Sequence, residues 1–300
     1  MSEIARSEEL RAPQPAGPEL CYQTFGDPED EPLLLVMGLG GPMTWWDTAI
    51  CERFVRAGFF VVRYDNRETG RSERGEGRVT KAQLVRAFLG LPTRAPYSIG
   101  DLAEDAFGLM DHLGWSSAHV CGVSMGGMIV QSMALARPER VRSMTSIMST
   151  TGRRTVGWQD PTLLPALLAP RQRDRASYID ASVGLWQRIG SPAYRRPDDV
   201  VRAQAAETWD RTISAAGVLR QMLAVLTQPD RTRALHDLDV PTLVIHGDAD
   251  RMVHVSGGRA TAAAVPGAEL LVVRGMGHDT PEPLHGLIVD GVRRTADRTS

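Results

Sequence analysis

One serine in the chain has the neighbours that a catalytic nucleophile requires. Ser124 is the centre of a Gly-x-Ser-x-Gly pattern, between an apolar run at 118–123 and a helical pattern at 125–137. A strand that turns sharply into a helix strains its corner residue and needs small neighbours, because strand and helix approach closely there. The corner side chain also stands at a helix N-terminus, which favours developing negative charge. The pattern predicts that Ser124 is a nucleophile; the alternative is a tight glycine turn with an idle serine.

A serine hydroxyl is weakly nucleophilic at neutral pH, so it needs a base, and the base needs an orienting acid. His278 follows a predicted strand, in a loop whose glycines at 275 and 277 let a side chain swing over the strand edge. We therefore expect His278 to be the base. We expect His285 to face solvent and consider that His246 could line the site, while His254 stays undecided beside the acid loop. Surface or structural roles are expected for the remaining histidines, His112, His119 and His236.

Two carboxylates come just past a predicted strand at 242–246, and either could reach the loop of His278. Asp248 follows Gly247 directly and would naturally cap the turn. Asp250 stands further along the loop, where a carboxylate could bond the imidazole Nδ1–H and stabilise imidazolium. The residues alone favour Asp250 only slightly.

The elements that must position these residues alternate along the chain. Short apolar runs, typical of strands buried on both faces, occur at 20–25, 32–37, 59–64, 118–123, 144–148, 242–246 and 270–273. Helical patterns occur at 46–57, 99–113, 125–137 and 258–264, and after position 283. This alternation predicts βαβ units, and hence an α/β fold with a mostly parallel sheet covered by helices on both faces.

One region interrupts the alternation. Residues 151–237 show helical and loop patterns with several prolines and no strand-like run. We interpret them as a helical cap inserted between two core strands, with a separate small domain as the alternative. The prediction is a core of 18–150 and 238–300, a cap of 151–237 and a loose N-terminal arm of 1–17. Eight apolar side chains could line a pocket, although most are expected to pack within the cap: Trp158, Leu163, Leu164, Leu167, Leu168, Trp186, Trp209 and Met222.

Composition limits the possible partners. The 300 residues are 42% hydrophobic and 23% charged, with a formal net charge of −2, so no strong field attracts nucleic acid or an anionic membrane. The three cysteines match no zinc or disulfide spacing, and neither a signal peptide nor a membrane span is visible. We expect a cytoplasmic protein, monomeric or homodimeric, that acts on a small molecule.

Five segments, taken in order, resemble the α/β-hydrolase superfamily, and in particular its esterases and perhydrolase-like enzymes with a helical cap. They are 34–41 (LLVMGLGG), 64–72 (YDNRETGRS), 122–127 (GVSMGG), 247–250 (GDAD) and 275–278 (GMGH). Together they extend over almost the whole chain. Among the subfamilies, the first two segments are most similar to those of the aclacinomycin methylesterases, which hydrolyse a methyl ester of an anthracycline polyketide.

The resemblance implies an α/β-hydrolase fold with a helical cap and places the family's acid on Asp250. It also implies an oxyanion hole made by the backbone N–H groups of Leu39 and Met125, each donor contributing about 3–4 kcal/mol. No metal or organic cofactor is required. The chain has Met37 where histidine often stands in the superfamily, so we expect its oxyanion loop to be held differently. Asp65 and Arg67 are expected to brace the site by analogy with the fold.

The implied reaction is hydrolysis of a carboxylic ester through an acyl-enzyme. The expected substrate is a small to medium apolar, aromatic or polyketide-like ester, with a methyl ester as one such form. A cofactor-free perhydrolase with the same three residues is one alternative, and a non-catalytic small-molecule receptor on this fold is another. Haloalkane dehalogenation is disfavoured because it would need a carboxylate at position 124.

Overall fold

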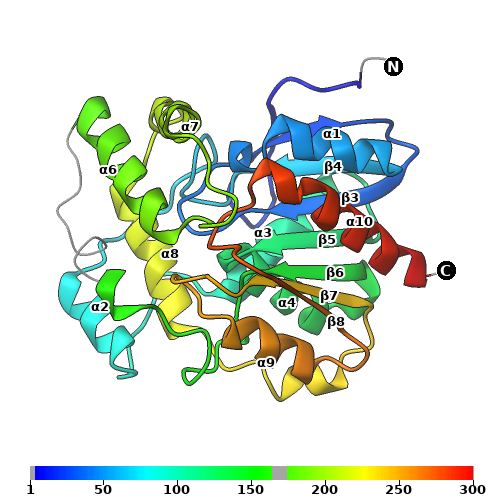
Figure 1. The fold of residues 1–300 in the computed structure, drawn as a ribbon. Helices are drawn as coiled ribbons and strands as arrows, with labels where there is room; N and C mark the ends of the chain where they lie inside the picture. The colour runs from blue at the N-terminus through cyan, green and yellow to red at the C-terminus, as the bar shows by residue number, and fades with distance from the viewer. Residues whose placement is uncertain (1–3, 164–173, 300) are drawn as a thin grey trace.

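The computed structural model describes residues 4–163 and 174–299, and its centre is an eight-stranded sheet (Figure 1). The strand order is β1-β2-β4-β3-β5-β6-β7-β8. The strands are β1 (Leu10–Ala12), β2 (Leu20–Phe25), β3 (Glu31–Val36), β4 (Phe59–Tyr64), β5 (Ala118–Val123), β6 (Val141–Ile147), β7 (Thr242–Gly247) and β8 (Glu269–Val273). The pairs β1–β2 and β2–β4 are antiparallel and all others are parallel. The predicted mostly parallel sheet is confirmed.

Helices cover both faces of the sheet (Figure 1). They are α1 (Thr48–Arg56), α2 (Lys81–Phe88), α3 (Ile99–His112), α4 (Met125–Ala136), α6 (Arg175–Ile189), α7 (Asp198–Asp210), α8 (Ala215–Thr227), α9 (Ser256–Ala264) and α10 (His285–Ala296). Short 3-10 turns occur at Met43–Trp45, Pro138–Arg140, Pro161–Leu163, Ala234–Asp237, Glu282–Leu284 and Asp297–Thr299. Apolar side chains of α3, α4 and α9 form one core with the sheet, and those of α1 and α10 form the other.

The central strands are continuous apolar runs because both of their faces are buried. Every residue of β4, β5 and β7 is buried. Strands buried in this way keep their register and length, and their carboxyl ends meet at one edge of the sheet. That edge is where a ligand site is expected in an open α/β sheet.

The prediction of a loose arm at 1–17 is wrong for its middle part. Strand β1 pairs with β2 in the register Leu10↔Tyr22 and Ala12↔Leu20, and Ala12 is fully buried. The outer edge of β2 would otherwise present unpaired N–H and C=O groups, which β1 satisfies. The N-terminal segment is therefore part of the sheet.

The stretch between β6 and β7 contains helices and no strand in its described residues. Helices α6, α7 and α8 lie together beyond the carboxyl edge of the sheet (Figure 1). Helix α2, for which the sequence predicted no element, joins this layer by packing against α8, where Val79, Ala87 and Leu223 are buried together. No helix in the described ranges is long and apolar enough to cross a membrane.

Candidate active site

Ser124 occupies a strained corner between β5 and α4. Its backbone has φ 56° and ψ −116°, in a region that non-glycine residues rarely adopt. The flanking glycines are required by close approach: a Cβ on Gly122 would lie 2.1 Å from the carbonyl oxygen of Gly126, and one on Gly126 would lie 2.1 Å from that of Val36. The N–H of Ser124 donates to the carbonyl of Ile147 at 2.9 Å. The corner thus presents the Ser124 side chain to a cavity beyond the sheet.

Three of the predicted site residues meet in one hydrogen-bonded row. His278 Nε2 lies 3.1 Å from Ser124 Oγ, and His278 Nδ1 lies 2.8 Å from Asp250 Oδ2. Ser124 follows β5, Asp250 follows β7 and His278 follows β8. Residues far apart in the sequence come together because the carboxyl ends of parallel strands share one edge. The geometry allows a proton to pass from the hydroxyl to an imidazole that a carboxylate orients.

Asp250 is buried and almost surrounded by donors. Its Oδ1 accepts from the N–H groups of Met252 at 2.8 Å and Val253 at 2.9 Å. Burial by itself would raise the pKa of Asp250, but the charge of His278 and hydrogen bonds from His246 and His278 outweigh it and hold that pKa below the ordinary aspartate value. The carboxylate is therefore ionised at neutral pH and suited to orient an imidazole.

His246 supports the acid from behind. Its Nε2 lies 2.8 Å from the carbonyl of Val253 and 3.4 Å from Asp250 Oδ2, and its ring is fully buried. The cavity wall does not include His246 among its described residues, so the idea that it lines the site is wrong. A fully buried ring packed between the acid and α9 has no path to the cavity.

The other carboxylate, Asp248, holds the loop of the base. Its Oδ1 accepts from the N–H of Gly275 at 2.6 Å, and the N–H of Ala249 donates to the carbonyl of Met276 at 3.1 Å. These bonds join the loop after β7 to the loop after β8. Asp248 was expected to cap the turn that follows Gly247, but its side chain instead bonds across to the loop after β8.

The remaining histidines lie outside the row of three. His285 was expected to face solvent, and this is wrong: it is 1% exposed, with Nε2 bonded to the carbonyl of Thr280 at 3.1 Å. The loop before α10, which contains Thr280, covers the imidazole of His285 in the first turn of the helix. His119 has the expected structural role, bonded to Ser143 at 2.8 Å. His254 stacks on Trp158 with ring centroids 4.2 Å apart.

The end of helix α6 pins the loop that carries the base. The N–H of His278 donates to the carbonyl of Ile189 at 2.7 Å, and the N–H of Gly277 donates to Ser191 Oγ at 2.9 Å. The Asp279 carboxylate accepts from the N–H of Ser191 at 2.8 Å. A Cβ on Gly277 would lie 2.5 Å from the carbonyl of Ile189. Glycine is needed at position 277 because the base loop there lies against the end of α6, a contact that the sequence analysis missed.

Helix α8 holds the loop that contains Leu39. Gln221 is fully buried, and its Oε1 accepts from the N–H of Gly40 at 2.8 Å. Its Nε2 donates to the carbonyl of Arg67 at 2.8 Å and to Thr69 Oγ1 at 3.0 Å. The glutamine thus ties the residue after Leu39 to the loop after β4. No sequence pattern singled it out.

The two expected oxyanion donors remain free to bind a ligand. Within the described ranges, the N–H groups of Leu39 and Met125 have no hydrogen-bond acceptor. Asn66 Nδ2 donates to the carbonyl of Met37 at 2.8 Å, which fixes the start of the loop from the other side. With Met37 in place of histidine, the loop is held by amide side chains on both sides.

The loop after β4 braces the site, as expected. Asp65 is fully buried and accepts from the N–H of Met43 at 2.7 Å and from Arg211 of the helical layer at 2.6 Å. Arg67 forms a two-pronged ion pair with Asp105 of α3. These charges are paired within the protein and do not line the cavity among the described residues.

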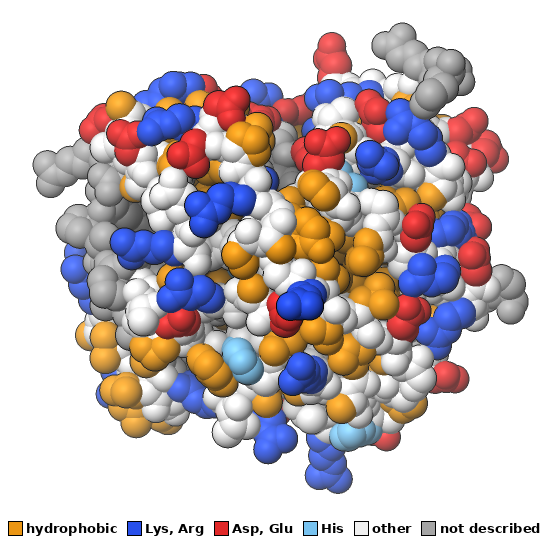
Figure 2. Space-filling view, viewed as in Figure 1, with side chains coloured by type: hydrophobic (Ala, Val, Ile, Leu, Met, Phe, Trp, Pro, Cys, Tyr) orange, Lys and Arg blue, Asp and Glu red, His pale blue; other side chains and the backbone are white. Residues whose placement is uncertain are grey.

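The cavity beside Ser124 has a volume of about 2150 Å³. Its wall is largely apolar, and Trp45 and Trp186 form an edge-to-face pair with centroids 5.3 Å apart. Of the eight side chains proposed from the sequence, Trp158, Trp186, Trp209 and Met222 line it, and Leu163 is buried elsewhere. Leu164, Leu167 and Leu168 lie outside the described residues. In the view of Figure 2, apolar side chains gather on the outer surface between α6 and α10.

The chain is similar in sequence to known proteins. The chain is 28% identical to rhodomycin D methylesterase DnrP of Streptomyces peucetius over 295 residues, 89% of this chain and 91% of that protein. It is 26% identical to a Mycobacterium tuberculosis protein whose provisional name is non-heme bromoperoxidase BpoC, over 86% of this chain and 90% of that protein.

Solved structures show the same fold. An enol-lactonase from Burkholderia xenovorans superposes with a TM-score of 0.75 at 22% identity, covering 96% of this chain and 100% of that one. The family described as alpha/beta hydrolase fold matches residues 31–282. That span includes the strained serine corner, the acid loop and the histidine loop. The chain therefore belongs to the α/β hydrolase family and is a hydrolase.

Proposed function

We propose that the chain is a carboxylic ester hydrolase in which Ser124 is the nucleophile, His278 the base and Asp250 the orienting acid. The observation that carries the proposal is the row of contacts from Ser124 Oγ to His278 Nε2 at 3.1 Å and from His278 Nδ1 to Asp250 at 2.8 Å. The lowered pKa of Asp250 keeps its carboxylate charged, so that imidazolium is stabilised when it forms.

The reaction proceeds in two acyl-transfer steps. His278 takes the proton of Ser124 as Oγ attacks the ester carbonyl, and the N–H groups of Leu39 and Met125 receive the oxyanion. The tetrahedral intermediate collapses, the C–O bond to the alcohol breaks, and the alcohol leaves with the proton from His278. Water, deprotonated by the same imidazole, then attacks the acyl-enzyme and releases the acid. The chain's own groups supply each proton transfer.

The cavity wall supports an apolar or aromatic ester as substrate. Trp45, Trp186 and Met37 offer flat and polarisable surfaces in the cavity that Ser124 also lines. A volume of about 2150 Å³ accommodates a polycyclic molecule as readily as a single ring. The relative named as a methylesterase supports a methyl ester, whose small alcohol demands little room beside His278.

The layer that closes the cavity is proposed to be a cap of residues 151–237 on a core of 18–150 and 238–300, with α2 as an additional element. Support comes from α6, α7 and α8, which supply a large part of the cavity wall, and from α2, which packs on α8. A cytoplasmic location and a monomeric or homodimeric state stay predictions from the sequence.

Labelling with a fluorophosphonate tests the nucleophile. We expect one adduct per chain, mapped by mass spectrometry to the peptide that contains Ser124. The Ser124→Ala variant should take up no label and should lose hydrolysis of p-nitrophenyl acetate, while its melting temperature shows that it is folded. An adduct on another serine would reject the site assignment. Binding of small ligands without any ester turnover would favour the receptor alternative.

Perhydrolysis is the second candidate, favoured by the relative with the bromoperoxidase name. Peroxide would replace water as the acceptor of the acyl group and form a peracid. Bromination of monochlorodimedone in acetate buffer with hydrogen peroxide and bromide measures this activity. If bromination is faster than ester hydrolysis and is lost in Ser124→Ala, the perhydrolase is the better description.

A further inference from the structure

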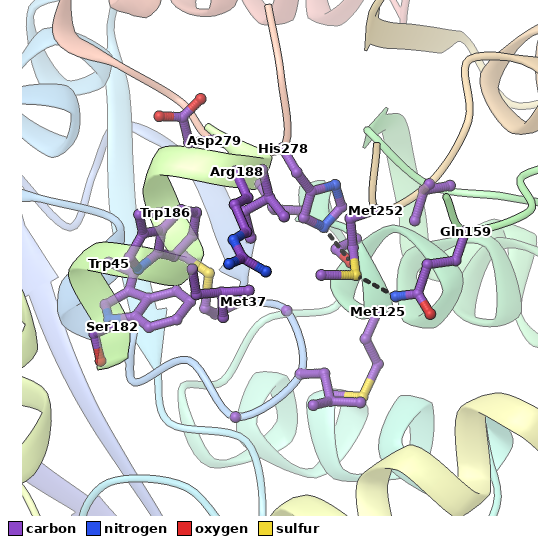
Figure 3. Close-up of a pocket in the computed structure, with 18 of the residues that line it drawn as sticks. Met37, Trp45, Met125, Gln159, Ser182, Trp186, Arg188, Met252, His278 and Asp279 are labelled. Carbon is purple, nitrogen blue, oxygen red and sulfur yellow. Dashed lines mark hydrogen bonds between the residues drawn. The ribbon is translucent and has the colours of Figure 1, made fainter. Parts of the chain in front are cut away.

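Arg188 is a cation of the cavity wall with no charge partner among the described residues. Arg188 is in the last turn of α6, its side chain is exposed, and it lines the cavity. In Figure 3 its guanidinium points into the cavity, between Trp45 and Trp186 on one side and His278 and Met252 on the other. No hydrogen bond or ion pair joins it to any other residue of the described ranges. A free donor group therefore faces the space that the substrate would occupy.

Two other arginines of this cavity are already engaged by the protein. Arg196 lies over the ring of Trp186 at 4.9 Å, with its Nε 3.3 Å from Asp279 Oδ2. Arg154 donates to carbonyl oxygens at the end of α2. Arg153 and Arg195 also line the cavity, and the experiment below separates them from Arg188.

The wall also contains the carboxylates of Asp47, Glu207, Asp279 and Glu282, and none of them forms an ion pair with Arg188 in the described residues. The Asp279 carboxylate is bound by Ser191 and Arg196, and Asp47 caps the first turn of α1 through the N–H of Ile50. A guanidinium beside aromatic and thioether surfaces presents paired N–H donors in one plane, which match the two oxygens of a carboxylate.

We propose that Arg188 forms an anion subsite and that the preferred substrates are esters that also carry a carboxylate. The proposal rests on the proposed ester hydrolysis at Ser124 and narrows its substrate class. The apolar wall binds the body of such a molecule, Arg188 binds its carboxylate, and the ester carbonyl is thereby held at the nucleophile. A neutral isostere would leave the guanidinium without its partner and lose that orientation.

Pairs of methyl esters that differ only in charge test the proposal. Monomethyl terephthalate and monomethyl isophthalate carry a carboxylate at two spacings from the ester, and their carboxamides are neutral molecules of the same shape. We expect the wild type to show at least a tenfold higher kcat/KM for one carboxylate ester than for its carboxamide, after division by their rates of alkaline hydrolysis. Arg188→Gln should bring the ratio close to one, chiefly through KM.

Charge removal elsewhere in the cavity provides the control. Arg153→Gln and Arg195→Gln should keep the wild-type ratio, and Arg188→Lys should keep part of it because the charge remains without the planar fork. A ratio near one in the wild type overturns the proposal. So does a ratio that survives Arg188→Gln or falls equally in Arg153→Gln.

Binding separates this inference from the hydrolysis itself. The Ser124→Ala variant should bind the carboxylate ester at least tenfold more tightly than the carboxamide, as followed by tryptophan fluorescence or calorimetry. The double variant Ser124→Ala, Arg188→Gln should not discriminate. If the wild type hydrolyses neither ester nor p-nitrophenyl acetate, the proposed function fails, yet this binding difference still decides whether the anion subsite exists.

Discussion

The carboxyl edge of the sheet and the helical layer above it contribute to the site in different ways. The edge carries the three residues that we propose to react, Ser124, Asp250 and His278, each of which follows a parallel strand. In the described residues, no hydrogen bond joins these three side chains to the helical layer of α2, α6, α7 and α8. It bonds instead to backbone groups of the loops, at Gly40 through Gln221 and at His278 through Ile189.

This difference indicates that the sheet edge and the helical layer have separate tasks. The sheet edge carries the groups that are proposed to react. The helices hold the loop that contains Leu39 and the loop that contains His278 through hydrogen bonds to their backbones. A misplacement of about 1 Å in such loops can cost roughly a hundredfold in rate. Substitutions in the two regions should therefore differ in size and in the kinetic constant that they change.

The largest effect is expected at the sheet edge, for Asp250→Asn. The amide has nearly the same shape but no charge, and it favours the wrong imidazole tautomer, so we expect kcat to fall by about 10³–10⁴-fold. Hydrolysis of p-nitrophenyl acetate in the linear phase measures the fall. Asp248→Asn is the matched control: its side chain bonds the N–H of Gly275 and not the imidazole, so a loss of less than tenfold is expected. Equal losses in the two variants would reject Asp250 as the acid.

A smaller effect is expected in the helical layer at Gln221. Gln221→Met keeps the size of the side chain but leaves the N–H of Gly40 without its acceptor, so the oxyanion loop loosens. We expect kcat to fall by about 10–100-fold with little change in KM. Gln221→Glu retains an acceptor oxygen for Gly40 and should recover part of the rate.

The melting temperature of both Gln221 variants shows whether the fold is intact. A purely structural role would lower the amount of folded protein and leave kcat per folded molecule unchanged. Equal kcat for Gln221→Met and the wild type would show that the helical layer does not position the loop.

The sequence predicted the sheet edge well, because its signals are local. Strands β4 and β5 lie at the predicted positions since strands buried on both faces read as apolar runs. The sharp corner at Ser124 was predicted because close approach there tolerates only glycine at Gly122 and Gly126. The acid was less certain, since Asp248 and Asp250 have similar surroundings in the sequence and only the fold distinguishes their partners.

The contacts of the helical layer could not be predicted in the same way. Gln221 stands among apolar residues of α8, and nothing in the sequence says which distant backbone group it meets. Helix α2 was missed because Val85 and Phe88 are exposed and its buried face is a single small patch. Strand β1 was missed because its three residues are too few to show a period. Each of these elements is defined by its partner.

A still smaller effect is expected at the end of α6. Ser191→Ala removes the oxygen that accepts from the N–H of Gly277, so the base loop loses one of its fixed points. We expect a three- to tenfold fall in kcat and a loss of about 1 kcal/mol in the free energy of unfolding. Ser182→Ala is the control within α6 itself: its hydroxyl donates to the carbonyl of Tyr178 in the same helix and not to the base loop, so kcat should stay unchanged. If both variants match the wild type, the junction with α6 has no role in placing His278.

The smallest effect concerns stability at low pH and returns to the sheet edge. Burial opposes the charge of Asp250, but His278 and His246 hold its folded-state pKa below the unfolded value of about 3.9. A carboxyl whose pKa is lowered by folding stabilises the protein above the unfolded pKa, and this contribution is lost as the pH falls toward the folded value. The free energy of unfolding should therefore decline between pH 4 and pH 2 more steeply in the wild type than in Asp250→Asn, as urea titrations at several pH values would measure. Parallel declines would mean that ionisation of the Asp250 carboxylate does not contribute to the stability of the fold.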